Sequence, residues 1–187
     1  MSKRFLAAAT CALVAAAGAA RATTLVPIDF NELAVTAQTV VYARVTAITT
    51  VLTDQHRIES IVTAEAIGYI KGGLGRTVSF RIPGGQIGAF RTVMVGAPTF
   101  AEGDEVVLFL GSRGPALPYL VGFSQGVYRV IADGRTGVRM VIPPPAINTG
   151  VTQKVVRGAA APLTLDAFTA RVHELNGGSA AGRRPVR

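Results

Sequence analysis

Residues 39–52 read TVVYARVTAITTVL, and after the polar turn TDQH at 53–56 the chain continues with RIESIVTAEAIGYIK at 57–71. Both stretches are rich in β-branched residues, which is typical of long strands. Small and apolar residues recur at every second position, so one face of each strand should pack against a core. On that face lie Val41, Ala43, Val45 and Ala47 of the first strand and Ile58, Ser60, Val62, Ala64 and Ala66 of the second. The sequence therefore predicts a long β-hairpin with one buried side.

Further strands follow this hairpin. Glu105–Leu110 is continuously apolar after its first residue, which is typical of a strand buried on both faces. Shorter strands are expected at 76–82, 89–95, 119–123, 126–132 and 137–142, with a turn-rich loop at 83–88. Because no βαβ alternation occurs, the strands predict an antiparallel barrel or sandwich. The long opening hairpin and the single continuous core strand favour a closed barrel of about five or six strands over a sandwich.

Two helices complete the expected fold. A short helix is predicted at 30–37, where Asp29 or Asn31 could cap it. A second helix follows Thr164, its expected N-cap, and Asn176-Gly177-Gly178 should end it. The residues at helical spacing that should pack on the barrel are Leu165, Phe168, Val172 and Leu175. The predicted fold class is mainly β, with a short N-terminal helix and one C-terminal helix.

Residues 1–22 are typical of a cleavable secretory signal peptide. Lys3 and Arg4 form a positive start, the 16 residues from Phe5 to Ala20 are uncharged and mostly apolar, and small residues precede the expected cut after Ala22. The predicted localisation is therefore secreted or periplasmic. A retained membrane span is the alternative, but a span needs roughly 20 apolar residues.

A lipid anchor is a further alternative for the same segment. Cys11, the one cysteine of the chain, would carry it. This reading is disfavoured because Cys11 lies inside the apolar run.

Cleavage would leave 165 of the 187 residues, which suits one domain at 23–176 followed by a disordered basic tail at 177–187. The formal net charge would fall from +8 to +5. Four of the remaining arginines lie in the last 17 residues, so the high isoelectric point is weak support for nucleic-acid binding. Without cysteine, the mature chain would have no thiolate metal site. No further membrane span, no cofactor and no nucleic-acid partner are expected.

Three short motifs follow one another at and after the expected mature N-terminus. It reads TTLVP at 23–27, and AQTVVYARV at 37–45 and YIKG at 69–72 follow. This order resembles the opening of netrin-like domains, the OB-fold modules of tissue inhibitors of metalloproteinases. The resemblance implies a small antiparallel OB-like barrel. The chain is also similar to exported bacterial proteins without assigned function, through PGG at 83–85, GAPTF at 96–100, GDE at 103–105, VLFL at 107–110 and QGVYRV at 125–130.

The resemblance also implies a binding site at the N-terminus. In these inhibitors the α-amino group and carbonyl of the first residue chelate the protease zinc, so Thr23 would take that role and Thr24 would enter the specificity pocket. The implied partner-binding residues are Thr23, Thr24, Leu25 and Val26, and the implied partner is a secreted or periplasmic protein such as a protease. The chain departs from the pattern because it lacks the pinning cysteines, and an unpinned terminus loses the preorganisation that tight binding requires.

The histidines and the carboxylates near them are weaker candidates for a functional site. Asp54, His56 and Glu59 could bind a metal or form a charge relay, but one imidazole with two carboxylates is a thin site, and a solvated turn is the favoured interpretation. His173 is expected to cap the C-terminal end of its helix.

Two loops resemble ligand-binding loops only superficially. The glycines of residues 84–88 lack a following Lys-Ser/Thr and predict tight turns rather than a phosphate loop. Glu102, Asp104 and Glu105 are too few for calcium and predict a charged turn before an apolar strand.

These observations leave three functional hypotheses. The first is an exported, non-enzymatic binding or structural module with no catalytic residue and no metal. The second is a metalloprotease inhibitor that acts through Thr23. The third is a hydrolase that uses His56.

Overall fold

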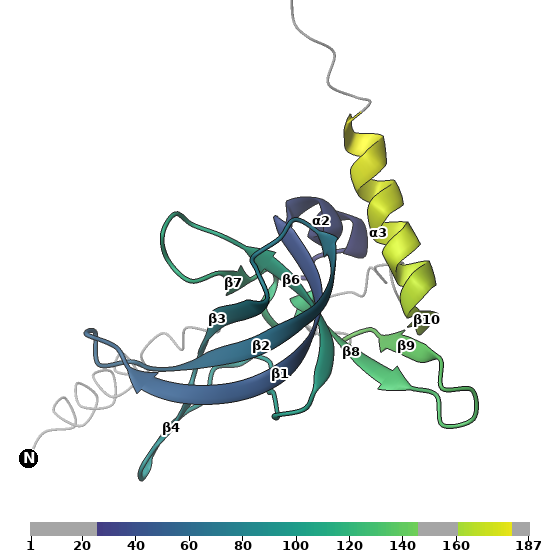
Figure 1. Ribbon diagram of the computed structural model, residues 1–187. Helices are drawn as coiled ribbons and strands as arrows, with labels where there is room; N and C mark the ends of the chain where they lie inside the picture. The colour runs from purple at the N-terminus through teal and green to yellow at the C-terminus, as the bar shows by residue number, and fades with distance from the viewer. Residues whose placement is uncertain (1–25, 146–160, 181–187) are drawn as a thin grey trace, which may run out of the picture.

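The computed structural model describes residues 26–145 and 161–180. The expected signal peptide, Thr23, Thr24 and Leu25 lie outside the described residues, as do residues 181–187 of the expected tail. Figure 1 shows a twisted barrel-like sheet with both helices at one end. The helices are α2 (Phe30–Thr36) and α3 (Leu165–Ala180), and a 3₁₀ turn spans Phe123–Gly126.

The protein is mainly β, as the sequence predicts. The strands are β1 (Thr39–Leu52), β2 (Ile58–Lys71), β3 (Thr77–Pro83), β4 (Gly85–Ile87), β5 (Phe90–Thr92), β6 (Glu105–Gly111), β7 (Tyr119–Leu120), β8 (Val127–Ala132), β9 (Arg139–Ile142) and β10 (Leu163–Thr164). The long hairpin is confirmed, because β1 and β2 pair antiparallel along their whole length. Three register shifts in this pair bend the strands, as bulges do at the corners of barrels.

Five strands form a partly closed ring in the order β1-β2-β3-β7-β6, with β6 pairing back onto β1. The ring is not wholly antiparallel, because β3 and β7 run parallel and meet at the single pair Arg81 and Tyr119. Strands β8, β9 and β10 extend the sheet from β6. The barrel-like ring expected from the sequence is therefore present, and its departure from an antiparallel arrangement is the β3–β7 pair.

Strand β6 separates two hydrophobic clusters and is buried on both faces, as predicted. Val106, Leu108 and Leu110 face the ring interior with residues from β1, β2 and β3. Phe109 and Val107 face the opposite way, toward the helices. Phe109 packs there against the rings of Phe30, Tyr128 and Phe168, with centroid distances between 5.5 and 6.1 Å.

The helix starts follow the expected capping. The Asp29 carboxylate accepts a hydrogen bond from the Glu32 amide at 2.8 Å, and the Thr164 hydroxyl accepts one from the Ala167 amide at 3.2 Å. The C-terminal end of α2 receives Lys71 of β2, whose ammonium donates to the Ala34 and Val35 carbonyls. Burial lowers the pKa of Lys71.

The end of α3 corrects two expectations. Asn176 and Gly177 do not stop the helix, which continues to Ala180 and so includes the first residues of the expected tail. The Asn176 side-chain Nδ2 donates to the Val172 carbonyl at 2.8 Å within the helix. His173 does not cap the helix, because its Nε2 lies 2.8 Å from the Ile70 carbonyl and so ties α3 to β2.

The segment after β3 also departs from the prediction. Residues 83–88 hold strand β4 rather than only a loop, and the strand expected at 89–95 is limited to Phe90–Thr92. β4 and β5 pair only with each other, as a separate two-stranded sheet. Within the described residues, no helix is long and apolar enough to cross a membrane.

Candidate interaction surface

The expected N-terminal site is described only at its last residue. Val26 is 77% exposed, while Thr23, Thr24 and Leu25 lie outside the described residues. The Gln125 side chain holds the neighbouring backbone from two sides. Its Nε2 donates to the Val26 carbonyl at 3.1 Å, and its Oε1 accepts from the Ile28 amide at 2.9 Å. Residues 26–28 are therefore attached to the barrel without a disulfide.

The metal site or charge relay that Asp54, His56 and Glu59 could have formed at the β1–β2 turn is not assembled. His56 takes a left-handed backbone conformation with φ of 54° in an exposed turn. Glu59 points instead to Arg81 of β3, with 3.2 Å between Nη1 and Oε2. Among the described residues, no three His, Cys, Asp or Glu side chains gather as metal ligands. The solvated turn is therefore the arrangement that the structure has.

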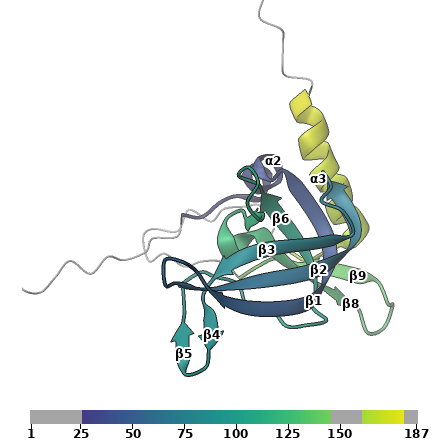
Figure 2. The same cartoon turned by 60° about the vertical axis from the view of Figure 1, so that its left-hand side comes forward.

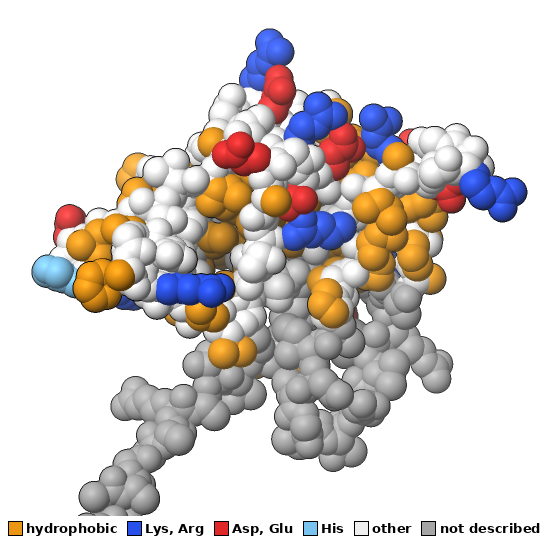
Figure 3. All heavy atoms as spheres, turned by 90° about the horizontal axis from the view of Figure 1, so that it is seen from below, with side chains coloured by type: hydrophobic (Ala, Val, Ile, Leu, Met, Phe, Trp, Pro, Cys, Tyr) orange, Lys and Arg blue, Asp and Glu red, His pale blue; other side chains and the backbone are white. Residues whose placement is uncertain are grey.

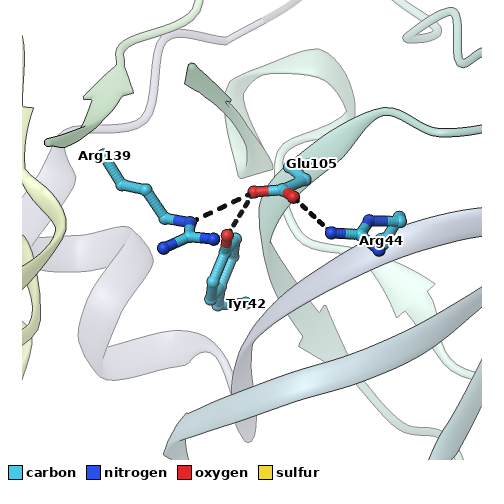
Figure 4. A network of polar contacts seen from close by, with 4 residues as sticks. All are labelled: Tyr42, Arg44, Glu105 and Arg139. Atoms are coloured by element: carbon cyan, nitrogen blue, oxygen red, sulfur yellow. Dashed lines mark hydrogen bonds and ion pairs between the residues drawn. The ribbon is translucent and has the colours of Figure 1, made fainter. Parts of the chain in front are cut away.

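The acidic residues before β6 form ion pairs with arginines. Glu105 accepts hydrogen bonds from the Tyr42 hydroxyl and from Arg44, the latter at 2.7 Å, and Arg139 lies 3.5 Å away (Figure 4). Asp104 pairs with Arg129 in the same way. Hydrogen bonds from Tyr42 and Arg44 hold the pKa of Glu105 below its ordinary value. Burial and the neighbouring carboxylate raise the pKa of Tyr42. These carboxylates therefore tie β1, β6, β8 and β9 together.

A small recess lies under α3. The side chains around it include Phe30, Tyr128, Leu163, Phe168 and Arg171. Its volume of about 10 Å³ has room for about one water molecule. Such a recess is too small for an organic ligand.

A surface that the sequence analysis did not single out lies on the β4–β5 hairpin. We call it the hairpin surface, and it comprises the exposed apolar residues of this hairpin and of the segment that follows β5: Ile87, Phe90, Val93, Met94 and Val95. Phe90, Val93 and Val95 are 76%, 73% and 71% exposed. Ile87 and Phe90 face each other across the hairpin, and Gln86 and Arg91 form the adjacent pair. Because side chains alternate between faces, the apolar pair and the polar pair point to opposite sides.

The base of this hairpin is closely seated on the β1–β2 hairpin. The Ser60 hydroxyl donates to the Gly84 carbonyl at 2.8 Å. A Cβ on Gly85 would lie 2.6 Å from Ser60 Oγ and 2.7 Å from a Thr50 methyl, and its φ of 140° also favours glycine. The two glycines of Pro83-Gly84-Gly85 therefore let the backbone lie close to Thr50 and Ser60, and this contact orients the β4–β5 hairpin.

The hairpin surface lies at the end of the barrel away from the helices. In Figures 1 and 2, β4 and β5 project from one end while α2 and α3 cover the other. Figure 3 views the projecting end directly and shows hydrophobic side chains spread over it, with most of the acidic side chains in the upper half of the view. Large apolar side chains gathered on an exposed surface mark a contact site.

The sequence held one signal of this surface. The sequence predicted a strand at 89–95 and gave no role to the exposed side chains of Phe90, Val93 and Val95. The glycines at 84, 85 and 88 all have positive φ and turn the chain out of the ring after β3. That density of glycine on both sides of so short an apolar run could have indicated a projecting hairpin.

The hairpin surface offers apolar area, and Arg91 on the opposite side of the same hairpin adds a guanidinium. Nothing in its composition provides a nucleophile with a paired base. Comparison with known proteins adds no assignment: no family model, no curated protein and no solved structure matches the chain.

Proposed function

We propose that this chain is an exported, non-enzymatic binding module whose contact surface is the hairpin surface. The observation that carries the proposal is the exposure of Phe90, Val93 and Val95 at one end of the barrel. Single exposed apolar residues are ordinary on protein surfaces, but a group of them marks an interaction site. The seated base at Gly84 and Gly85 supports this use, because a preorganised contact loses less entropy on binding.

Export and the OB-like architecture belong to the same proposal. The segment 1–22 supports secretion or a periplasmic location through its signal-peptide pattern. The ring order β1-β2-β3-β7-β6 supports an OB-like barrel, since five strands close with one late strand inserted beside the third. Loops and short hairpins at the ends of such barrels are suited to partner recognition.

Site-specific photo-crosslinking in the exporting cells tests the proposal. A photoreactive phenylalanine analogue replaces Phe90 in one variant and Ile131, an exposed residue of β8, in the control. We expect a discrete adduct, to a protein or to a lipid, from position 90 and none from position 131. The absence of any adduct from position 90, or the same adduct from both positions, would contradict the proposal.

A second candidate function is inhibition of a metalloprotease by the N-terminus. The observation that favours it is the Gln125 clamp on Val26 and Ile28, which supplies attachment where the related inhibitors use disulfides. Thr23 and Thr24 would then contact the protease, with Leu25 and Val26 behind them. No observation favours a hydrolase that uses His56.

The inhibitor candidate has its own test. Adding one residue before Thr23 should abolish inhibition of a secreted zinc protease, because it displaces the α-amino group that would reach the metal. The variant Gln125→Ala should weaken inhibition and speed hydrogen exchange of the Ile28 amide. Inhibition that survives the added residue would exclude this mechanism.

A further inference from the structure

We infer that the partner of the hairpin surface is a lipid interface that carries anionic headgroups. The inference rests on the proposed function, since it names the partner of that same surface. It follows from three properties of the surface: its charge, its shape and its apolar tip.

The segment between Glu65 and Glu102 carries charges of one sign only. It has four cationic residues and no carboxylate. Arg76 and Arg81 pair with carboxylates of β2, and Lys71 caps α2. Arg91, beside Phe90 on β5, forms no ion pair with a carboxylate of the described residues.

The neighbouring turn adds a second arginine. Arg57 also lacks an ion pair within the described part of the chain, and Asp54 is the one nearby carboxylate that is likewise unpaired there. Asp54 balances the charge of Arg57 within this turn, so Arg91 is, among the described residues, the unpaired cation that lies next to the apolar tip of the hairpin. An anionic lipid surface attracts such a cation.

The shape of the surface fits a lipid interface better than a protein groove. Ile87 and Phe90 lie opposite each other at the tip of a narrow projecting hairpin, with the turn Gly88-Ala89 between them. The polar pair Gln86 and Arg91 is set back by one residue from this tip. Shallow insertion would bury the tip among acyl chains while the arginine stem extends back to the headgroups.

The absence of carboxylates from the β4–β5 hairpin itself favours lipid over protein. A protein partner with both signs of charge would tolerate carboxylates around the contact, whereas an anionic interface would repel them. Over 36 consecutive residues, from Ala66 to Ala101, the chain contains none. The lipid interface is therefore the occupant that charge and shape favour together.

Tryptophan fluorescence tests the inference locally, because the chain has no tryptophan of its own. The full chain is prepared as Phe90→Trp and, as the control, as Ile131→Trp on the β8–β9 hairpin. Each is titrated with vesicles of phosphatidylcholine alone and of phosphatidylcholine with phosphatidylglycerol in equal parts. Brominated acyl chains quench only a tryptophan that enters the hydrocarbon layer. The quenching therefore reports on position 90 or 131 itself, even if the N-terminal segment also binds the vesicles.

We expect the Phe90→Trp emission to shift to the blue and to be quenched only by the anionic vesicles, while Ile131→Trp stays unchanged. In the Phe90→Trp background, Arg91→Gln should raise about fivefold the lipid concentration at which the emission change is half complete. The matched control Arg135→Gln should leave that concentration unchanged. Replacing Ile87 by Ser should raise it about tenfold, because a buried apolar side chain is lost.

Two results would overturn the inference: no change at position 90, or equal changes with neutral and anionic vesicles. A protein adduct from position 90 in the crosslinking experiment, together with no response to vesicles, would keep the binding module and reject the lipid interface. No adduct and no response would reject both.

Discussion

Phe109 and Phe90 are the same residue type placed in β-strands at opposite ends of the molecule, with opposite surroundings. Phe109 is fully buried and contacts three aromatic rings under α2 and α3. Phe90 is 76% exposed on a hairpin that pairs with no strand of the ring. The difference teaches that packing against the helices, and not strand content, decides which of these two phenylalanines is buried and which stays exposed.

The largest expected effect comes from truncating these two phenylalanines. Phe109→Ala should lower the free energy of unfolding by about 3–5 kcal/mol, because it leaves a cavity within an aromatic cluster. Phe90→Ala should change it by about 0.5 kcal/mol or less, as is usual for exposed positions. Urea unfolding followed by circular dichroism measures both. Comparable losses in the two variants would break the contrast between the ends.

A smaller effect is expected from alkaline titration of the covered end. Burial raises the pKa of Tyr128 from 10.0 to about 12. The neutral hydroxyl is therefore favoured in the folded state, and its contribution is complete below pH 10 and lost as the pH rises toward 12. Across that window the wild-type chain should lose about 2–3 kcal/mol more than Tyr128→Phe does.

The measurement for Tyr128 is the free energy of unfolding at several alkaline pH values. Tyr69→Phe serves as the control, because its hydroxyl donates to the Gly75 carbonyl in an exposed turn. A wild-type curve that runs parallel to the Tyr128→Phe curve would show that burial of this hydroxyl does not govern the alkaline loss.

The smallest effect concerns the ion pairs that join the strands. Hydrogen bonds from Tyr42 and Arg44 lower the pKa of Glu105 in the folded state. Its contribution is therefore present above the ordinary pKa of 4.5 and is lost as the pH falls below it. Glu105→Gln should cost about 1 kcal/mol at neutral pH and should flatten the acid side of the stability curve. Glu102→Gln, at an exposed turn position, should do neither.

Much of the fold could be predicted because it follows from local patterns. Alternation along Thr39–Leu52 identified the ring-facing side of β1, and the unbroken apolar run identified β6 as a strand buried on both faces. The alternation did not show that the first part of β1 is also buried on its other face, where Val40 and Tyr42 pack in the cluster under the helices. Asp29 and Thr164 were recognisable as helix caps because capping acts within three residues. These signals concern neighbours in the chain.

The features that were missed depend on distant partners. The parallel pair of β3 and β7 rests on one residue pair, and the Gln125 clamp joins residues 97 positions apart. His173 was expected to cap its own helix and instead bonds to β2, 103 positions away. No periodicity encodes such contacts, because many long-range pairings are compatible with one pattern of burial.

The features of the hairpin surface can also be separated into those that the sequence determines and those that depend on the tertiary structure. The sequence by itself determined that residues 87–95 are mostly apolar, that no carboxylate occurs between Glu65 and Glu102, and that glycines interrupt the chain beside Phe90. Only the tertiary structure decided that these apolar residues stay exposed. The ring closes without them, since β7 takes the position beside β3 and leaves the β4–β5 hairpin no strand of the main sheet to pair with.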